Sequence, residues 1–166
     1  WSNGTLTISG LKLVGTKGSY TLTLSDTDHP YVADPVSGVA AATGSTTLAF
    51  GAAHHVTVTS TPATARNRFA FGSDVTVEVR DSGGNRVEDS TANVTLAVKS
   101  GDSGTFDGSG PSVTVAAVAG TATFDKYSLT LKQVSISDSA SSTSVRLTAT
   151  STGLQSGDSS GITVSA

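Results

Sequence analysis

Apolar and polar residues alternate one by one along eight short segments of the chain. These segments are residues 5–8, 20–24, 55–59, 74–80, 93–99, 112–115, 145–150 and 162–164. Because successive side chains of a strand point to opposite faces of a sheet, this alternation predicts strands with one apolar face each. Threonine fills most of the polar positions, where its branched Cβ favours a strand and its hydroxyl meets water.

Turn-forming residues separate the alternating segments. Gly, Asp, Ser and Asn cluster at residues 81–85, 101–104 and 107–111. No window of eleven or more residues has the apolar spacing of a helix. Short strands with one apolar face bury that face by packing sheet against sheet, so we expect an all-β fold, an antiparallel β-sandwich.

Composition excludes several classes of protein. The 166 residues include 26 Ser and 26 Thr, no Cys and no Met, and the formal net charge is -3. Without Cys, a disulfide framework and a cysteine-ligated metal site are ruled out. The chain has no run of basic residues that would attract nucleic acid. It also has no apolar run that approaches the ~20 residues needed to span a membrane. A chain rich in Ser and Thr that lacks Cys and Met suits an oxidising exterior, so we expect an extracellular or cell-surface location.

The N-terminal segments repeat a pattern found near the C-terminus. Residues 4–8 match 120–124, residues 20–24 match 145–149, and residues 37–39 match 160–162, at offsets of 116, 125 and 123. A period near 120 residues is typical of tandem whole domains rather than of a solenoid. We therefore expect residues 47–166 to form one complete unit. Residues 1–46 would be the C-terminal strands of a partial unit, or strands that pack on a neighbour.

The larger unit carries a recognisable series of strand and turn segments. They are residues 55–58, 71–79, 80–87, 94–98, 104–106, 113–115, 120–124, 147–149 and 151–154, together with Pro62. In this order they resemble the bacterial immunoglobulin-like repeats of very large secreted and cell-surface proteins. One departure is residues 125–144, which carry Lys126, Tyr127 and Lys132 where that family usually has a compact apolar strand.

The resemblance implies an immunoglobulin-like antiparallel β-sandwich, with a partial second immunoglobulin-like unit at the N-terminus. It also implies a non-catalytic structural, spacer or adhesion module of a bacterial surface protein. Expected partners are neighbouring immunoglobulin-like domains or other copies of the chain, with surface polysaccharide and a host or cell-surface ligand as alternatives. Repeats of this kind serve many roles, so the fold alone does not select among them.

The sequence contains weak echoes of enzyme motifs. His54 after two alanines, and Asp102 followed by Ser103, resemble the motifs of chymotrypsin-like proteases. Thr105 stands where a second glycine is needed for the oxyanion hole, and 49 residues separate His54 from Ser103, too few for two barrels. We therefore expect no enzyme activity and no catalytic residues.

Metal binding is expected at most in acidic loops. His54 and His55 are adjacent, so on a regular strand they would point to opposite faces and not share an ion. The best candidate is a calcium site of three carboxylates, at Asp26, Asp28 and Asp34. Pro30 and the lack of a closing Glu exclude an EF-hand, and a solvated turn is the alternative. Asp102 and Asp107 form a second, weaker candidate, and no other cofactor is expected.

A carbohydrate-binding module is an alternative function, and it would need exposed aromatic rings. The pattern predicts core positions for all five phenylalanines, which are Phe50, Phe69, Phe71, Phe106 and Phe124. Trp1 is terminal, so Tyr31 and Tyr127 remain as a weak platform.

The N-terminal segments present an apolar face that they cannot bury alone. Its members are Leu6, Ile8, Tyr20, Leu22 and Leu24, with Leu11, Leu13 and Val39 nearby. Leaving such side chains in water costs several kcal/mol at about 25 cal/mol per Å2. The segment could be the remnant of a longer protein, it could pack on the chain's own sandwich, or another copy could supply the missing strands. The last option would make the chain a self-assembling fibre or sheath subunit.

Overall fold

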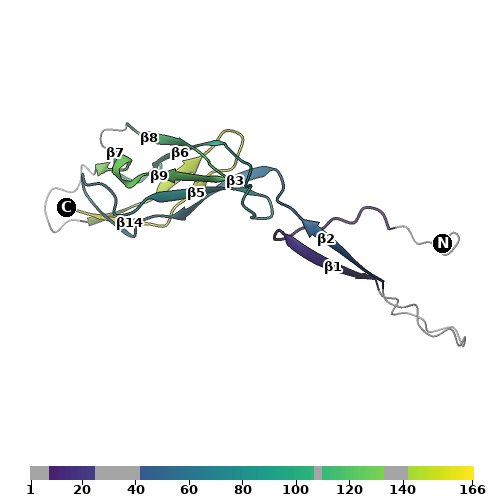
Figure 1. Ribbon diagram of the computed structural model, residues 1–166. Helices are drawn as coiled ribbons and strands as arrows, with labels where there is room; N and C mark the ends of the chain where they lie inside the picture. Colours follow the sequence, from purple (N-terminus) through teal and green to yellow (C-terminus); the bar gives the residue numbers. More distant parts are fainter. Residues whose placement is uncertain (1–7, 25–41, 107–109, 133–141) are drawn as a thin grey trace, which may run out of the picture. The chain divides into compact units, whose positions relative to one another are not determined.

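The computed structural model describes residues 8–24, 42–106, 110–132 and 142–166 (Figure 1). It divides the chain into two compact units, Trp1–Ala49 and Phe50–Ala166. The sequence placed this boundary after residue 46.

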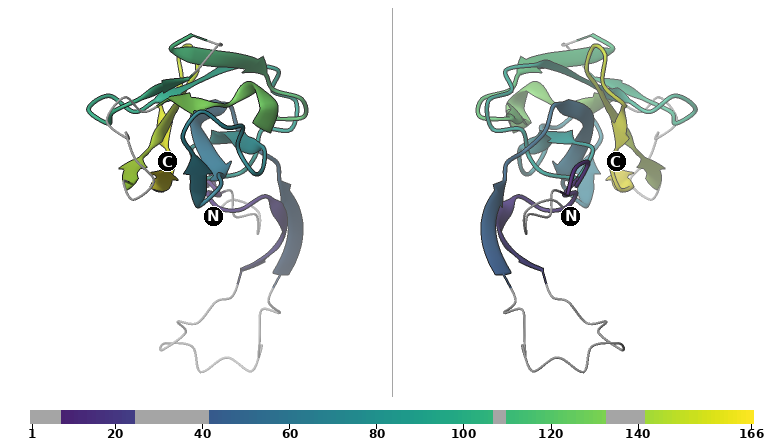
Figure 2. Two further views of the ribbon diagram at one scale, coloured as in Figure 1. Left: turned by 90° about the vertical axis from the view of Figure 1, so that its left-hand side faces the viewer. Right: turned by 90° about the vertical axis from the view of Figure 1, so that its right-hand side faces the viewer.

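Two facing layers of strands form the larger unit (Figures 1 and 2). The first sheet has the order β3-β5-β9, comprising β3 (Ala53–Ser60), β5 (Val75–Asp81) and β9 (Thr121–Phe124). The second has the order β13-β12-β6-β8, comprising β13 (Gly157–Asp158), β12 (Leu147–Thr150), β6 (Asn93–Val98) and β8 (Ser112–Ala116). All pairs within these two sheets are antiparallel.

Shorter strands extend this arrangement. A three-stranded sheet has the order β11-β14-β4, comprising β11 (Ser142–Val145), β14 (Ile162–Ser165) and β4 (Thr64–Arg66). β11 runs antiparallel to β14, whereas β4 runs parallel to it. β7 (Thr105–Phe106) pairs with β10 (Leu131–Lys132), and the 3₁₀ turn η1 (Lys126–Ser128) lies between β9 and β10.

The strand order is that of an immunoglobulin-like sandwich. In chain order β3, β5 and β9 take the places of strands A, B and E, while β6, β8, β12 and β13 take those of C, C′, F and G. The predicted all-β fold with antiparallel sheets is confirmed.

Side chains from both layers form one core. Its members are Val56, Ala65, Phe71, Val75, Val77, Val79, Val87, Val94, Leu96, Phe106, Ala117, Ala122, Phe124, Leu129, Leu131, Val145, Leu147, Ala149, Ile162 and Val164. Along β5 the valines at alternate positions are buried, as the pattern predicts. Three predicted core phenylalanines, Phe71, Phe106 and Phe124, are buried, and Phe50 packs partly against the core.

The prediction for Phe69 was wrong, because 55% of this residue is exposed. Phe69 lies after β4, in the connection to β5, where no strand alternation acts on it. Leu129 and Leu131, from residues 125–144, are completely buried in the core instead. Leu131 is the first residue of β10, and Leu129 lies two residues before it.

A buried carboxylate anchors the turn after β5. Asp81 Oδ1 accepts hydrogen bonds from the backbone N–H groups of Gly83 (2.9 Å) and Asn85 (2.8 Å), and Oδ2 accepts one from Gly51 N–H (2.7 Å). The Asn85 side chain also donates to both oxygens. The Gly51 hydrogen bond is the main reason that the pKa of Asp81 falls to about 2, and the bonds from Asn85 and Gly83 lower it further against the effect of burial. Asp81 therefore ties the start of the sandwich to this turn.

A tight two-residue turn lies in the connection between β8 and β9. Val118 and Thr121 exchange backbone hydrogen bonds of 2.8 and 3.0 Å around Ala119 and Gly120, whose φ angles are 49° and 76°. Positive φ at both positions defines a type I′ turn, which favours Asn rather than Ala first. Ala119→Asn should therefore raise the free energy of unfolding by about 1 kcal/mol, measured by urea denaturation. An unchanged or lower midpoint would contradict this turn assignment.

The smaller unit contains an antiparallel hairpin of β1 (Gly18–Leu24) and β2 (Ala42–Leu48). β1 coincides with the predicted strand at residues 20–24. No strand was predicted at β2, because only two of its seven residues, Ala42 and Leu48, are apolar. Ile8, expected at the end of a first strand, lies outside any strand, and residues 5–7 and 37–39 lie outside the described residues.

Candidate interaction surface

The register of the hairpin sorts its residues into two chemically distinct faces. Directly paired residues share a face, and one face consists of Gly18, Tyr20, Leu22, Leu24, Ala42, Gly44, Thr46 and Leu48. The other face consists of Ser19, Thr21, Thr23, Thr43, Ser45 and Thr47. Every residue of this second face carries a hydroxyl, whereas the first face holds all the large apolar residues. We call the first face the apolar hairpin face.

The apolar hairpin face is not covered within the described residues. Leu22 and Leu24 are 49% and 51% exposed, and Tyr20 and Leu48 are half-buried. Gly44 and Ala42 lie opposite the two leucines, so little side-chain bulk from β2 shields them. None of the residues of this unit whose burial is described is buried. A two-stranded hairpin without a core is marginally stable in water at best.

The hairpin also has two open edges. In the described part of the chain β1 and β2 pair with each other alone, so the outer N–H and C=O groups of both strands have no ladder partner there. The preceding segment adds further exposed apolar side chains, namely Ile8, Leu11, Leu13 and Val14. The hairpin can therefore accept additional strands at its edges and an apolar surface on one face.

Only part of the predicted interaction set can be placed. Tyr20, Leu22 and Leu24 lie together on the apolar hairpin face, and Ile8 is 49% exposed outside it. Leu6 lies outside the described residues. The residues that β2 contributes were missed. Their one sequence signal is the alternation of hydroxyl residues at 43, 45 and 47, which places the intervening positions on the opposite face.

The proposed calcium ligands cannot be placed either. Asp26, Asp28 and Asp34 lie outside the described residues, and so does Asp107 of the second candidate. Asp102 is held by Arg146, whose backbone N, Nε and Nη2 donate to its oxygens at 2.7, 3.2 and 3.0 Å. These hydrogen bonds lower the pKa of Asp102 and raise that of Arg146. Among the described residues no group of three or more His, Cys, Asp or Glu side chains is placed to hold a metal ion.

A second ion pair lies beside the first. Lys99 donates a hydrogen bond to Asp158, and Thr148 Oγ1 donates to the same carboxylate at 2.6 Å. Lys99 is the main cause of the lowered pKa of Asp158, and Thr148 adds to it. Both pairs start from the loop after β6, and they reach Arg146, which directly precedes β12, and Asp158 of β13. These carboxylates therefore stabilise the pairing of β6, β12 and β13 at the surface.

The prediction that His54 and His55 point to opposite faces was wrong. The register of β3 against β5 shifts between Ala53 and His55, and this irregularity turns both rings to one side. The two Nδ1 atoms lie 3.3 Å apart, and the rings meet edge to face. Since His54 Nδ1 faces His55 and Asp102 is bound by Arg146, these residues are not arranged as the protease echo would require.

In the part of the chain that the structure describes, no helix has the length and hydropathy to cross a bilayer.

Comparisons with known proteins yield only distant similarity. No family model and no curated protein matches the chain. Two structures of Parabacteroides merdae β-glucuronidase are similar to 76% and 75% of it, at 15% and 14% identity and TM-scores of 0.41 and 0.40. Bacteroides uniformis β-glucuronidase 3 is similar to 93% of it, at 15% identity and a TM-score of 0.36. The chain spans 14%, 15% and 17% of the length of these three chains, so the activity in their names belongs to much larger proteins.

Proposed function

We propose that the chain is a non-catalytic structural module of an extracellular bacterial surface protein, joined to its neighbours through the N-terminal hairpin. The observation that carries this proposal is the apolar hairpin face, since Leu22 and Leu24 remain about half exposed beside an all-hydroxyl opposite face. A sheet with one apolar and one hydroxyl face is built to lie against another layer on one side and water on the other.

The larger unit supports the same role. Its core takes side chains from both layers, and its described surface carries carboxylates that pair with Arg and Lys rather than converge on a site. Along the chain, a hairpin without its own core precedes a sandwich that has one. We expect this order where consecutive repeats are joined, with strands of another domain or copy completing the hairpin.

In a solution of the pure chain, only a second copy of the chain can supply the strands that complete the hairpin from another molecule. We therefore expect the 1–166 chain to self-associate with increasing concentration, with two apolar hairpin faces packed together. Static light scattering over a hundredfold range of concentration would measure this. Hydrogen exchange should show protection of the β1 and β2 amides that increases with association.

Leu22→Ser combined with Leu24→Ser should weaken self-association at least tenfold. Each substitution removes about 1 kcal/mol from the free energy of association, because the leucine side chain is no longer buried between the two copies. A change of 1.4 kcal/mol corresponds to a tenfold change in the dissociation constant. The matched control is Thr21→Ser with Thr23→Ser, which changes the same strand on its hydroxyl face and should leave association unchanged. A monomer at every concentration, with rapidly exchanging β1 and β2 amides, would sink the proposed joint between copies.

A further inference from the structure

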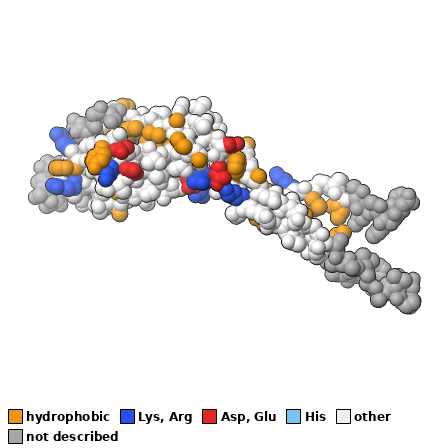
Figure 3. All heavy atoms as spheres, in the orientation of Figure 1, with side chains coloured by type: hydrophobic (Ala, Val, Ile, Leu, Met, Phe, Trp, Pro, Cys, Tyr) orange, Lys and Arg blue, Asp and Glu red, His pale blue; other side chains and the backbone are white. Residues whose placement is uncertain are grey.

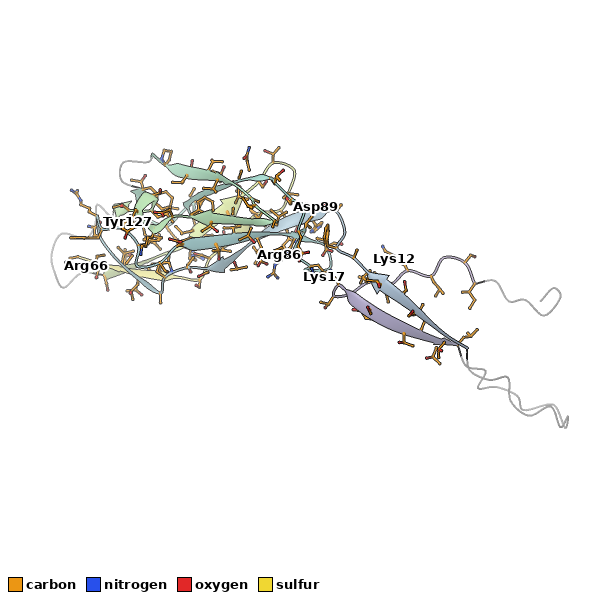
Figure 4. The ribbon with its side chains drawn as sticks, viewed as in Figure 1. Lys12, Lys17, Arg66, Arg86, Asp89 and Tyr127 are labelled. Carbon is orange, nitrogen blue, oxygen red and sulfur yellow. The ribbon has the colours of Figure 1, made fainter. Side chains whose placement is uncertain are left out.

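One end of the sandwich gathers cations and exposed aromatic rings from two separate segments. Arg66 is the last residue of β4, Arg68 and Phe69 lie in the connection from β4 to β5, and Lys126 and Tyr127 come from η1. We call these five residues the basic aromatic end. Figure 4 places Arg66 and Tyr127 at the same end of the sandwich, and Figure 3 shows basic and apolar side chains side by side there.

Backbone hydrogen bonds hold the two segments together. Arg68 N–H donates to Leu131 C=O at 2.7 Å, and Phe71 N–H lies 3.3 and 3.2 Å from the carbonyl oxygens of Lys126 and Leu129. Leu129, Leu131 and Phe71 are all buried in the core. The exposed side chains therefore project from backbone that is fixed to the core.

Both aromatic rings are unusually exposed for this chain and each has a cation beside it. Phe69 is 55% and Tyr127 74% exposed. The Arg66 guanidinium carbon lies 4.5 Å from the centre of the Phe69 ring, and Lys126 Nζ lies 5.0 Å from that of Tyr127. A cation over one face orients the ring, which leaves the other face for an apolar surface of a ligand.

The charges at this end differ from those elsewhere on the sandwich. Four other cations pair with carboxylates, as Arg80–Glu78, Arg86–Glu88, Lys99–Asp158 and Arg146–Asp102. Within the described residues no ion pair joins Arg66, Arg68 or Lys126 to a carboxylate.

The two nearby carboxylates are engaged with the backbone. Asp74 accepts from Lys126 N–H at 3.0 Å, and Asp125 accepts from Tyr127 N–H at 2.7 Å. These two bonds fix the backbone that carries Lys126 and Tyr127. Both carboxylates keep their charge, so three cations and two carboxylates leave one net positive charge at this end, in a chain whose net charge is -3.

Arg68 also has a backbone conformation that arginine rarely adopts. Its φ of 65° lies in the left-handed region, which costs an L-residue roughly 1–2 kcal/mol. Glycine would meet this requirement without strain. Arginine at this position, next to the exposed Phe69, therefore costs stability that glycine would not cost.

We propose that the basic aromatic end binds an acidic polysaccharide, independently of the hairpin joint. The C–H faces of the sugar rings stack on Phe69 and Tyr127, and the carboxylates pair with Arg66, Arg68 and Lys126. A neutral polysaccharide would not use the cations. In a uronic acid the carboxylate is attached to the sugar ring that stacks, which suits cations 4.5 and 5.0 Å from the ring centres. In a nucleotide the ribose separates the phosphate from the base that would stack.

Affinity electrophoresis in native gels tests the proposal with two probes that share one backbone. Polygalacturonate should retard the chain, and its fully methyl-esterified form should retard it at least tenfold less, since esterification removes the charge. Phe69→Ala with Tyr127→Ala, and separately Arg66→Ala with Lys126→Ala, should each weaken retardation about tenfold or more. Arg86→Ala is the matched control, because it removes an exposed arginine of the same unit that lies at the other end of it (Figure 4).

Arg68→Gly separates binding from folding. It removes the side chain and relieves the left-handed backbone, so the melting temperature should equal or exceed that of the unmodified chain while retardation by polygalacturonate weakens. Equal retardation by the acidic and esterified probes would overturn the proposal, as would no retardation by polygalacturonate. Tighter binding of a single-stranded oligonucleotide that competes with polygalacturonate would replace the proposed partner with a nucleic acid.

Discussion

Asp81→Ala is expected to lower the free energy of unfolding of the sandwich by about 3 kcal/mol. The substitution removes the acceptor of the Gly51, Gly83 and Asn85 backbone N–H groups, and a buried donor left without a partner costs about 1–3 kcal/mol. Water can reach part of this turn, which limits the total. Urea denaturation followed by circular dichroism would measure the loss.

Asp89→Ala is the matched control for Asp81→Ala. It removes the same charge from an exposed position eight residues later, so the free energy of unfolding should change by less than about 0.5 kcal/mol. Equal losses in the two variants would show that charge, rather than the hydrogen-bonded turn, determines the effect.

The same carboxylate should make the sandwich sensitive to acid. Because the pKa of Asp81 is about 2 in the folded state and 3.8 in its ordinary state, ionisation stabilises the fold. This contribution is complete above about pH 4 and is lost as the pH falls towards 2. Between these values the unmodified chain should lose more stability than Asp81→Ala does. Parallel pH profiles for the two proteins would contradict this assignment.

Gly120→Ala should destabilise the sandwich by roughly 2–4 kcal/mol, for two separable reasons. The φ of 76° is strained for alanine, and a Cβ would lie 2.4 Å from the backbone oxygen of Val87. The carbonyl belongs to backbone rather than to a flexible side chain, so relief requires the segments around residues 87 and 120 to separate. Thermal and urea unfolding would both report the change.

Two other glycines separate strain from overlap. Gly153 has the same φ of 76° but open space around a Cβ, so Gly153→Ala should cost about 1 kcal/mol. Gly72 has neither a positive φ nor a neighbour within 4 Å, so Gly72→Ala should be neutral or slightly stabilising. A loss in Gly120→Ala no larger than that in Gly153→Ala would show that the overlap is relieved without cost.

The candidate interaction surface was only half predictable. Tyr20, Leu22 and Leu24 alternate with threonines, which indicates a strand with one apolar face. Their partner strand β2 has few apolar residues, and its pairing spans the 17 residues between Leu24 and Ala42. Local pattern cannot specify a pairing over such a distance when one strand lacks a strong apolar face.

The basic aromatic end was hidden for a related reason. Phe69 lies outside the strands, so the usual preference of phenylalanine for the core predicted burial. Leu129 and Leu131 are buried in the core, whereas Phe69 is exposed. Which of several apolar residues fills a given space in the core depends on how distant segments pack. The exposure of the Phe69 ring could therefore be recognised only from the tertiary structure.

By itself, the sequence determined the all-β class, the alternation of buried valines in β5 and the absence of cysteine chemistry, because these depend on period and composition alone. The tertiary structure decided which strands pair, where the β3 irregularity turns both histidines to one side, and which aromatic rings remain exposed. Each of these depends on contacts between residues far apart in the chain. Such contacts form only when the strands compete for one core, and no local pattern encodes the outcome.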